Sequence, residues 1–300
     1  MLQTVYVALS GVLLLAVVAS LVLWIRQVIP FWSQGPRAFA ENLIPVRPRW
    51  RPFWGVAEVL IMFGSMLVLG EVIRRTLVGR GLLPPIDEAG LTQPETADQL
   101  IAMVAGTSVA SLGAVALVLA WMRLIDRDAR RKLGLTFCLS DVWLGLVAAV
   151  MILPPVLLLS AVVNELVEYE HPVLESLTEL ASPTVFAAIF VGTAIVTPIV
   201  EEVMLRGLLQ GALQGYADRA SDPDGTNSEW RPTSFWPIAA TSLIFSILHL
   251  GQGAAPIPLF LLSIGLGYLY RQTGSLTAPI VVHTVLNGMT LIAEFSKQGT

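Results

Sequence analysis

Charged side chains are scarce in this sequence. Asp, Glu, Lys and Arg make up 13% of its 300 residues, whereas an average soluble domain carries roughly 25%. Hydrophobic residues make up 55%, and the mean hydropathy is +0.72. This composition excludes an ordinary soluble domain and predicts an integral membrane protein, which we expect in the cytoplasmic (plasma) membrane.

Two other absences narrow the function. The formal net charge is −4, so the basic surplus typical of nucleic-acid binding is missing and no nucleic-acid partner is expected. The chain has a single cysteine, Cys138, which excludes an intrachain disulfide. We interpret Cys138 as a small residue near a helix start rather than as a redox group.

The sequence does contain a series of apolar runs, and a spanning helix needs about 20 apolar residues. No basic segment precedes the first run, so we expect a retained span rather than a cleaved signal peptide. The sixth and seventh runs are short and are separated by the turn GQGAAP, which allows two short spans or a re-entrant hairpin. The predicted fold class is therefore all-α, a polytopic transmembrane helical bundle of about eight spans: 4–25, 53–73, 99–122, 141–163, 184–215, 235–250, 256–270 and 276–294.

The loops between these runs differ in their content of Lys and Arg. Thirteen of these residues fall in loops on one side of the predicted bundle, and four fall on the other side. Because cytoplasmic loops carry the excess of Lys and Arg, we expect both termini to be extracytoplasmic. The loops predicted to be cytoplasmic are 26–52, 123–140, 216–234 and 271–275.

Ionisable and amide side chains interrupt the last apolar runs. An ionised side chain at the bilayer centre costs roughly 2.5–3.5 kcal/mol, so such residues face the protein interior and are functional candidates. Two of the three histidines are among them, whereas His171 lies in an acidic loop and is interpreted as a solvated residue. The candidates are Glu201, Glu202, Arg206, His249, His283 and Asn287.

The stretch TPIVEEVMLRG holds the first three candidates. Residues four apart share a helix face, so Glu202 and Arg206 can pair. Glu201 points about 100° away from Glu202 and has no cation at helical spacing, which makes it the better candidate for a reactive carboxylate. Pro198 removes one helical hydrogen bond and frees the carbonyl of Ala194, so a kink there would make room for water beside Glu201.

The other candidates also occur at a spacing of four. Phe245 precedes His249 in FSILHL, and His283 precedes Asn287 in HTVLNG. A carboxylate that takes a proton from water, with an imidazole that holds the water or protonates a leaving amine, makes a hydrolytic site, and a histidine and an asparagine one turn apart can donate to an oxyanion. Alternatively, Glu201, His249 and His283 form a zinc site with an open position for water. The spacing does not choose between these chemistries.

These motifs resemble those of the CPBP family, which is named for CAAX proteases and bacteriocin-processing enzymes. EEVMLRG is similar to the family motif EExxxR, FSILH to FxxxH, and HTVLN to HxxxN. The resemblance covers about residues 184–290, including the run GYLYRQTGSLTAPIVVH, and departs at Leu205, where many members have phenylalanine. We expect one integrated membrane domain, with N-terminal helices and polar loops in 1–135 and a CPBP-like protease core in 136–300.

The resemblance implies an intramembrane endopeptidase built as an eight-helix bundle and similar to the type II CAAX prenyl endopeptidases. In those enzymes the first motif glutamate and the second-motif histidine are thought to activate water, which carries over to Glu201 and His249. His283 and Asn287 would stabilise the oxyanion, and the Glu–Arg pair would support the site. The family is often described as metalloproteases, yet hydrolysis without a catalytic metal has also been argued. Zinc therefore stays open as a cofactor, and Glu201 is favoured as the general base.

Other functions fit parts of the pattern. A buried Glu–Arg pair can be purely structural, and a non-catalytic binding or immunity protein of the same fold would keep the helices. A proton-relaying transporter would show inverted repeats, and no internal repeat is evident. The intact motifs favour the enzyme, whose expected partners are membrane lipid and a peptide or membrane-protein substrate. The sequence does not decide among a prenylated CAAX tail, a leader peptide and a membrane-protein segment.

Overall fold

The computed structural model describes residues 2–30, 35–85, 94–166, 180, 182–221 and 227–297, and His171 lies outside these ranges. The described chain is built from helices, which confirms the predicted all-α class. The helices are α1 (Leu2–Val28), α2 (Gly35–Leu43), α3 (Val56–Gly79), α4 (Ala97–Ile125), α5 (Ala129–Lys132), α6 (Leu139–Asn164), α8 (Pro183–Ile189), η2 (Phe190–Val196), α9 (Thr197–Glu202), η3 (Val203–Gln210), α10 (Gly211–Ala217), η4 (Arg219–Ser221), α11 (Trp236–Leu248), α12 (Pro256–Thr273) and α13 (Thr277–Lys297).

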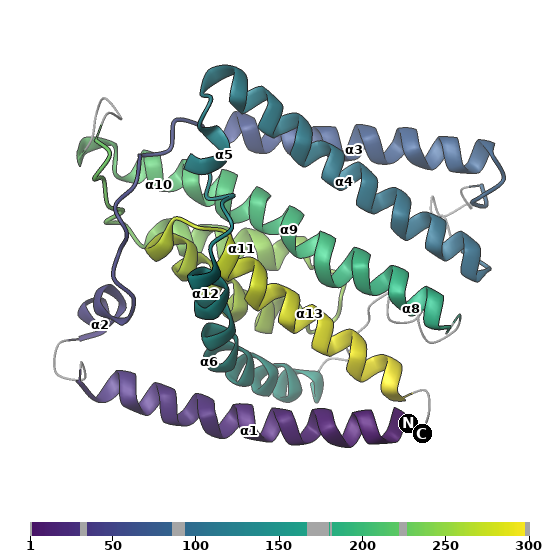
Figure 1. Ribbon diagram of the computed structural model, residues 1–300, viewed down its shortest axis with the longest axis horizontal. Coiled ribbons are helices and arrows are strands. Elements are labelled where there is room, and N and C mark those ends of the chain that lie inside the picture. Colours follow the sequence, from purple (N-terminus) through teal and green to yellow (C-terminus); the bar gives the residue numbers. More distant parts are fainter. Residues whose placement is uncertain are drawn as a thin grey trace.

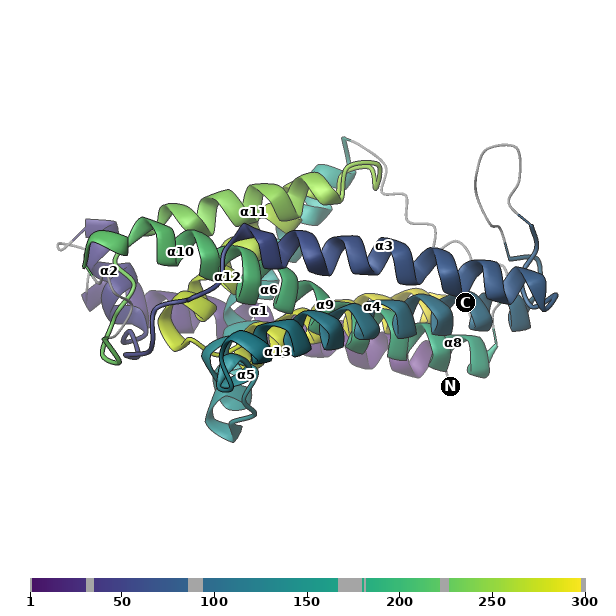
Figure 2. The same ribbon diagram turned by 90° about the horizontal axis from the view of Figure 1, so that it is seen from above.

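The long helices form a bundle around α13 (Figure 1). Helix α13 packs against α1, α6, α12, η2 and α9, while α3 pairs with α4 and α11 pairs with α12. Helices α6 and α13 approach closely at Gly145, where an added Cβ would lie 2.9 Å from the carbonyl oxygen of Ala278. Helix α1 begins and helix α13 ends at the same end of the bundle, and α2, α5 and α10 lie at the opposite end (Figure 1 and Figure 2).

The count of membrane-spanning helices is lower than predicted. The helices α11 and α12 form where the sixth and seventh runs were expected, but α11 has 13 residues, roughly 20 Å, against a hydrocarbon core of about 30 Å. Helix α12 ends in the polar residues Arg271, Gln272 and Thr273. The predicted count of about eight is therefore corrected to six, or seven with α11. The six described helices long and apolar enough to cross are Gly11–Val28, Val56–Gly79, Ala97–Ile125, Leu139–Asn164, Pro183–Ala217 and Thr277–Ser296.

A proline inside α6 fixes where α1 packs. Pro155 has no N–H, so the carbonyl of Met151 lacks its helical donor. The side chains of Ser20 and Trp24 donate to that carbonyl from α1, with Oγ and Nε1 at 3.1 Å and 2.9 Å. Only 6% of the α1 span is buried within the protein. These two hydrogen bonds therefore anchor a helix that otherwise makes little buried contact.

The helical run Pro183–Ala217 is continuous but not uniform. Its π-helical segments η2 and η3 flank the α-helical turn α9, which carries both glutamates. The N–H of Thr197 donates to the carbonyl of Gly192, five residues earlier. In this register Pro198 faces the carbonyl of Thr193 rather than that of Ala194, because a π-helical bond spans one residue more. The expected proline kink is thus a local widening of the helix.

The segment before α3 packs across the α10 end of the bundle. The backbone N–H of Arg49 donates to the carbonyl of Trp230 at 3.0 Å. Buried Trp54 donates from Nε1 to the carbonyls of Gly207 and Leu208, each at 3.1 Å. A Cβ at Gly211 would lie 2.9 Å from the Trp54 ring. The N-terminal part therefore braces the helix that carries the glutamates.

Candidate active site

A cavity of about 540 Å³ lies between α6, α9, α13 and the turn that follows α11. The sequence-predicted residues that line this cavity are Glu201, His249, His283 and Asn287. Glu202 and Arg206 lie behind it, and both side chains are fully buried. The structure therefore brings all six candidates together from three separate stretches of the chain.

Glu202 holds the buried side of the site together. One carboxylate oxygen lies 3.1 Å from Nε of Arg206, and the other lies 3.0 Å from Nδ1 of His283. The pair at i and i+4 is the one that helical spacing predicted. The guanidinium also lies over the ring of Phe245, 5.1 Å from its centroid. Carboxylate and ring together compensate a cation that has left water.

Glu201 differs from its neighbour in both access and partners. Its side chain is 23% exposed and lines the cavity. The imidazole of His283 lies near it, with 3.7 Å between Oε2 of Glu201 and Nε2 of His283. That separation is too long for a hydrogen bond. Glu201 therefore has a carboxylate oxygen available to a ligand in the cavity.

His249 ends the helix α11 and has a defined tautomer. Its Nδ1 lies 2.8 Å from the carbonyl oxygen of Phe245, which can only accept, so Nδ1 carries a proton. This leaves Nε2 to exchange a proton with a ligand. The ring centroid of Phe245 lies 4.6 Å from that of His249 and 5.8 Å from that of His283. The phenylalanine thus positions both imidazoles.

Asn287 connects α13 to the widened helix. Its Nδ2 donates to the carbonyl of Thr193 at 2.9 Å. This is the carbonyl that faces Pro198 in the π-helical register and so lacks a backbone donor. The amide has two N–H groups, so one remains for a ligand. Asn287 thus has a structural bond in addition to its place at the cavity.

The positions of the side chains bear on whether the site can bind zinc. Within the described residues, no group of three His, Cys, Asp or Glu side chains is arranged to hold a metal ion. Nδ1 of His283 is bonded to Glu202 and Nδ1 of His249 to a backbone carbonyl, which leaves only Nε2 of each ring as a possible metal ligand. No described ion pair or hydrogen bond joins Glu201 to His249. Glu201, His249 and His283, as they lie, do not fit a three-ligand zinc site.

The sequence reasoning missed several polar residues that line the cavity: Ser160, Asn164, Thr193, Thr197, Gln252, Thr290 and Glu294. Thr193 and Thr197 line the cavity beside Glu201. Together the three polar residues form a stripe at a spacing of four along an apolar run, which is a signal that periodicity could have shown. The side chain of Thr197 donates to the carbonyl of Gly192 at 3.1 Å, so it also supports the widened turn.

Comparisons with known proteins agree with the motifs. Residues 183–289 match the model of the family described as Type II CAAX prenyl endopeptidase Rce1-like. No curated protein and no solved structure matches the chain. The matched segment runs from the start of α8 into α13 and contains all six candidates, so the resemblance drawn from the motifs is confirmed. The family's description is that of a CAAX-type endopeptidase, and the segment that holds the site is similar to this Rce1-like type II CAAX prenyl endopeptidase family.

Proposed function

We propose that the protein is an intramembrane endopeptidase in which Glu201 activates water to hydrolyse a peptide bond. The observation that carries this proposal is the contrast between the two glutamates. Glu202 is fully buried and paired with Arg206 and His283, whereas Glu201 lines the cavity with two histidines and an asparagine. A partly exposed carboxylate that makes no hydrogen bond within the described chain, facing a cavity large enough for a peptide segment, is suited to general base catalysis.

The proposed reaction proceeds through a tetrahedral intermediate. Glu201 takes a proton from water, and the resulting hydroxide adds to the carbonyl carbon of the scissile bond. The oxyanion accepts hydrogen bonds from Asn287 and from Nε2 of His283, when that nitrogen carries a proton. The carbon–nitrogen bond then breaks, and the leaving amine takes a proton through His249 or Glu201. The products are a carboxylate and an amine, and no other reactant is consumed.

The substrate is a peptide or a membrane-protein segment that reaches the site from the bilayer or its surface. We propose cleavage at or within the cytoplasmic side of the membrane. The family's description favours a prenylated CAAX tail among the three classes that the sequence leaves open. Peptides of each class, presented to the protein in vesicles, would separate them by cleavage rate.

The Glu201→Gln variant tests the base. Glutamine keeps the size of the side chain but cannot take the proton from water. We expect the cleavage rate to fall by about 10²–10⁴-fold, the range typical for a lost general base. The melting temperature should stay near that of the wild type, because the partly exposed carboxylate makes no hydrogen bond within the described chain. Mass spectrometry of a peptide incubated with purified protein in vesicles measures the rate.

Two results would contradict the proposal. A Glu201→Gln protein that cleaves as fast as the wild type would show that another group is the base. A wild-type protein that binds the peptides of all three classes but cleaves none would support the binding or immunity protein instead. Binding is measured separately by retention of the same peptides on the reconstituted protein.

Metal content gives a second test of the mechanism. Because no three-ligand group is assembled, we expect less than one zinc per chain in protein that cleaves peptide, and cleavage that resists a chelator. Elemental mass spectrometry of the wild type and of the His249→Ala/His283→Ala variant gives the zinc content. One zinc per chain that is lost in the variant would make the histidines ligands and would require the site to rearrange.

A further inference from the structure

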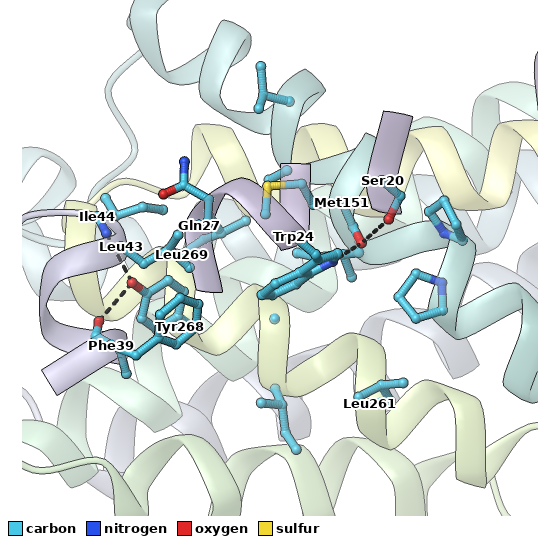
Figure 3. A pocket seen from close by; sticks show the side chains of 18 of the residues that line it. Ser20, Trp24, Gln27, Phe39, Leu43, Ile44, Met151, Leu261, Tyr268 and Leu269 are labelled. Atoms are coloured by element: carbon cyan, nitrogen blue, oxygen red, sulfur yellow. Dashed lines mark hydrogen bonds between the residues drawn. The ribbon is translucent and has the colours of Figure 1, made fainter. Parts of the chain in front are cut away.

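A second cavity lies outside the candidate active site. It measures about 840 Å³ and is bordered by α1, α2, α6, α11 and α12 (Figure 3). Its walls are almost wholly apolar, and no Asp, Glu, Lys, Arg or His lines it. Helix α6 separates it from the active-site cavity, because Val156 and Leu157 face the site whereas Pro155 and Leu158 line the larger cavity.

The few polar atoms in this cavity are mostly satisfied by the protein itself. Ser20 and Trp24 both donate to the carbonyl of Met151 (Figure 3). The hydroxyl of Tyr268 donates to the carbonyl of Ala40 at 2.8 Å and accepts from the N–H of Ile44 at 3.2 Å. A ligand in contact with these groups is therefore not required to supply hydrogen bonds. This chemistry selects a hydrocarbon.

Water does not fill such a space, since apolar cavities stay dry. An empty cavity of this size would forfeit the packing contacts of its whole lining. The walls include α1 and α6, whose exposed leucines Leu21 and Leu158 are on spanning helices. The cavity is therefore bordered by helices that contact bilayer hydrocarbon, and acyl chains are the abundant molecules at that depth.

Charged residues near one end of the cavity indicate which kind of molecule supplies the hydrocarbon. Gln27 lines the cavity in the last turn of α1, and the exposed Arg26 precedes it. The amphipathic helix α2 contributes Phe39 and Leu43 to the wall, and its exposed Arg37 is paired with Glu41 at 3.1 Å. A cation beside an apolar cavity complements a phosphate attached to an acyl chain. We propose that this cavity binds one acyl chain of a bilayer phospholipid, with its headgroup beside Arg26. This proposal does not depend on the proposed protease activity.

The bound chain would also support the site. It would fill the space between α1 and α6 next to the two hydrogen bonds that anchor α1. Leu13 of the same helix lines the active-site cavity. Loss of the chain should therefore loosen the wall of the active site as well as its own cavity.

The test is to count phospholipids on the purified protein. Protein in lipid-free detergent is incubated with dioleoylphosphatidylglycerol vesicles or with dioleoylphosphatidylcholine vesicles, repurified, and examined by native mass spectrometry. We expect the wild type to retain one phospholipid per chain, with the anionic lipid preferred. Ala239→Trp places a large side chain in the cavity from α11 and should lower retention at least tenfold. Ala105→Trp, at an exposed alanine of α4 away from the cavity, should leave retention unchanged.

Several results would overturn the proposal. They are a folded wild type that retains no phospholipid, an Ala239→Trp protein that retains as much as the wild type, and release of the lipid by one equivalent of a lipid-modified peptide. The last result would assign the cavity to the substrate. If Ala239→Trp fails to give monodisperse protein, Leu261→Trp fills the same cavity from α12 and is judged by the same count.

Discussion

At the scale of single residues, two adjacent glutamates of identical chemistry receive opposite environments. Glu202 is fully buried between a guanidinium and an imidazole, and Glu201 is 23% exposed at the cavity. One turn of regular α-helix is enough to produce this contrast, because neighbouring residues point about 100° apart. The sequence predicted it from the i and i+4 spacing of Glu202 and Arg206 alone. It did not show that His283 bonds to Glu202, because the two are 81 residues apart.

The difference in environment predicts that the same substitution lowers the melting temperature at Glu202 and leaves it nearly unchanged at Glu201. Glu202→Gln removes the charge beside Arg206, whose Nη atoms have no hydrogen-bond partner in the described chain. An uncompensated buried cation costs about 3–5 kcal/mol, which is a drop in melting temperature of roughly 6–20 °C. Thermal unfolding in detergent measures it, with Glu201→Gln as the matched control. Equal melting temperatures for the two variants would mean that the Glu202–Arg206 pair does not compensate buried charge.

At the scale of elements, the contacts of the helix Pro183–Ala217 depend on its irregularity. Two π-helical segments widen it on either side of α9. The widening shifts the carbonyl that Pro198 leaves without a donor to Thr193, and Asn287 fills that place from α13. Such segments are frequent at functional sites. The proline therefore creates a contact between two helices instead of a simple kink.

The effect of the hydrogen bond between Asn287 and Thr193 can be tested with a second substitution that is expected to compensate for its loss. Asn287→Leu should destabilise the protein by about 1 kcal/mol, because the half-buried Thr193 carbonyl then loses its donor in the protein. Pro198→Ala restores a backbone N–H opposite that carbonyl. In the double variant, the cost of Asn287→Leu should therefore be smaller than in the wild-type background. Thermal unfolding of the four proteins gives the coupling, and strictly additive effects would disprove the link between Asn287 and Pro198.

Helix positions were predictable, whereas helix register and helix length were not. Apolar runs located every long helix, and the spacing of four placed Phe245 correctly beside His249. The apolar periodicity did not show the π-helical hydrogen bond between Thr197 and Gly192. A hydrogen bond that spans one more residue than in an α-helix requires no change of residue type. The shortness of α11 was visible in its run, but its pairing with α12 is a tertiary contact that no local pattern contains.

At the scale of the whole molecule, the distribution of charge gives the bundle two different ends. The arginine-rich loops lie around α2, α5 and α10, and the opposite end holds the two ends of the chain (Figure 1). The positive-inside rule predicts that the end with α5 faces the cytoplasm. Helix α4 has 29 residues, roughly 43 Å of helix, which is more than the hydrocarbon core requires. Residues that precede and follow α4 should therefore face opposite compartments.

The single cysteine makes this orientation measurable. Cys138 is exposed and follows α4, and its contact with the Ser140 hydroxyl at 3.0 Å lowers the pKa of the thiol, which favours the reactive thiolate. A maleimide that does not cross membranes should label Cys138 in inverted vesicles and not in intact cells. Glu95→Cys, made with Cys138→Ser, places the thiol at an exposed site before α4 and should show the reverse pattern. If both cysteines are labelled from the same side of the membrane, α4 does not span it. If Cys138 is labelled in intact cells and the cysteine at position 95 only in inverted vesicles, the orientation is the reverse of the predicted one and the arginine-rich end lies outside.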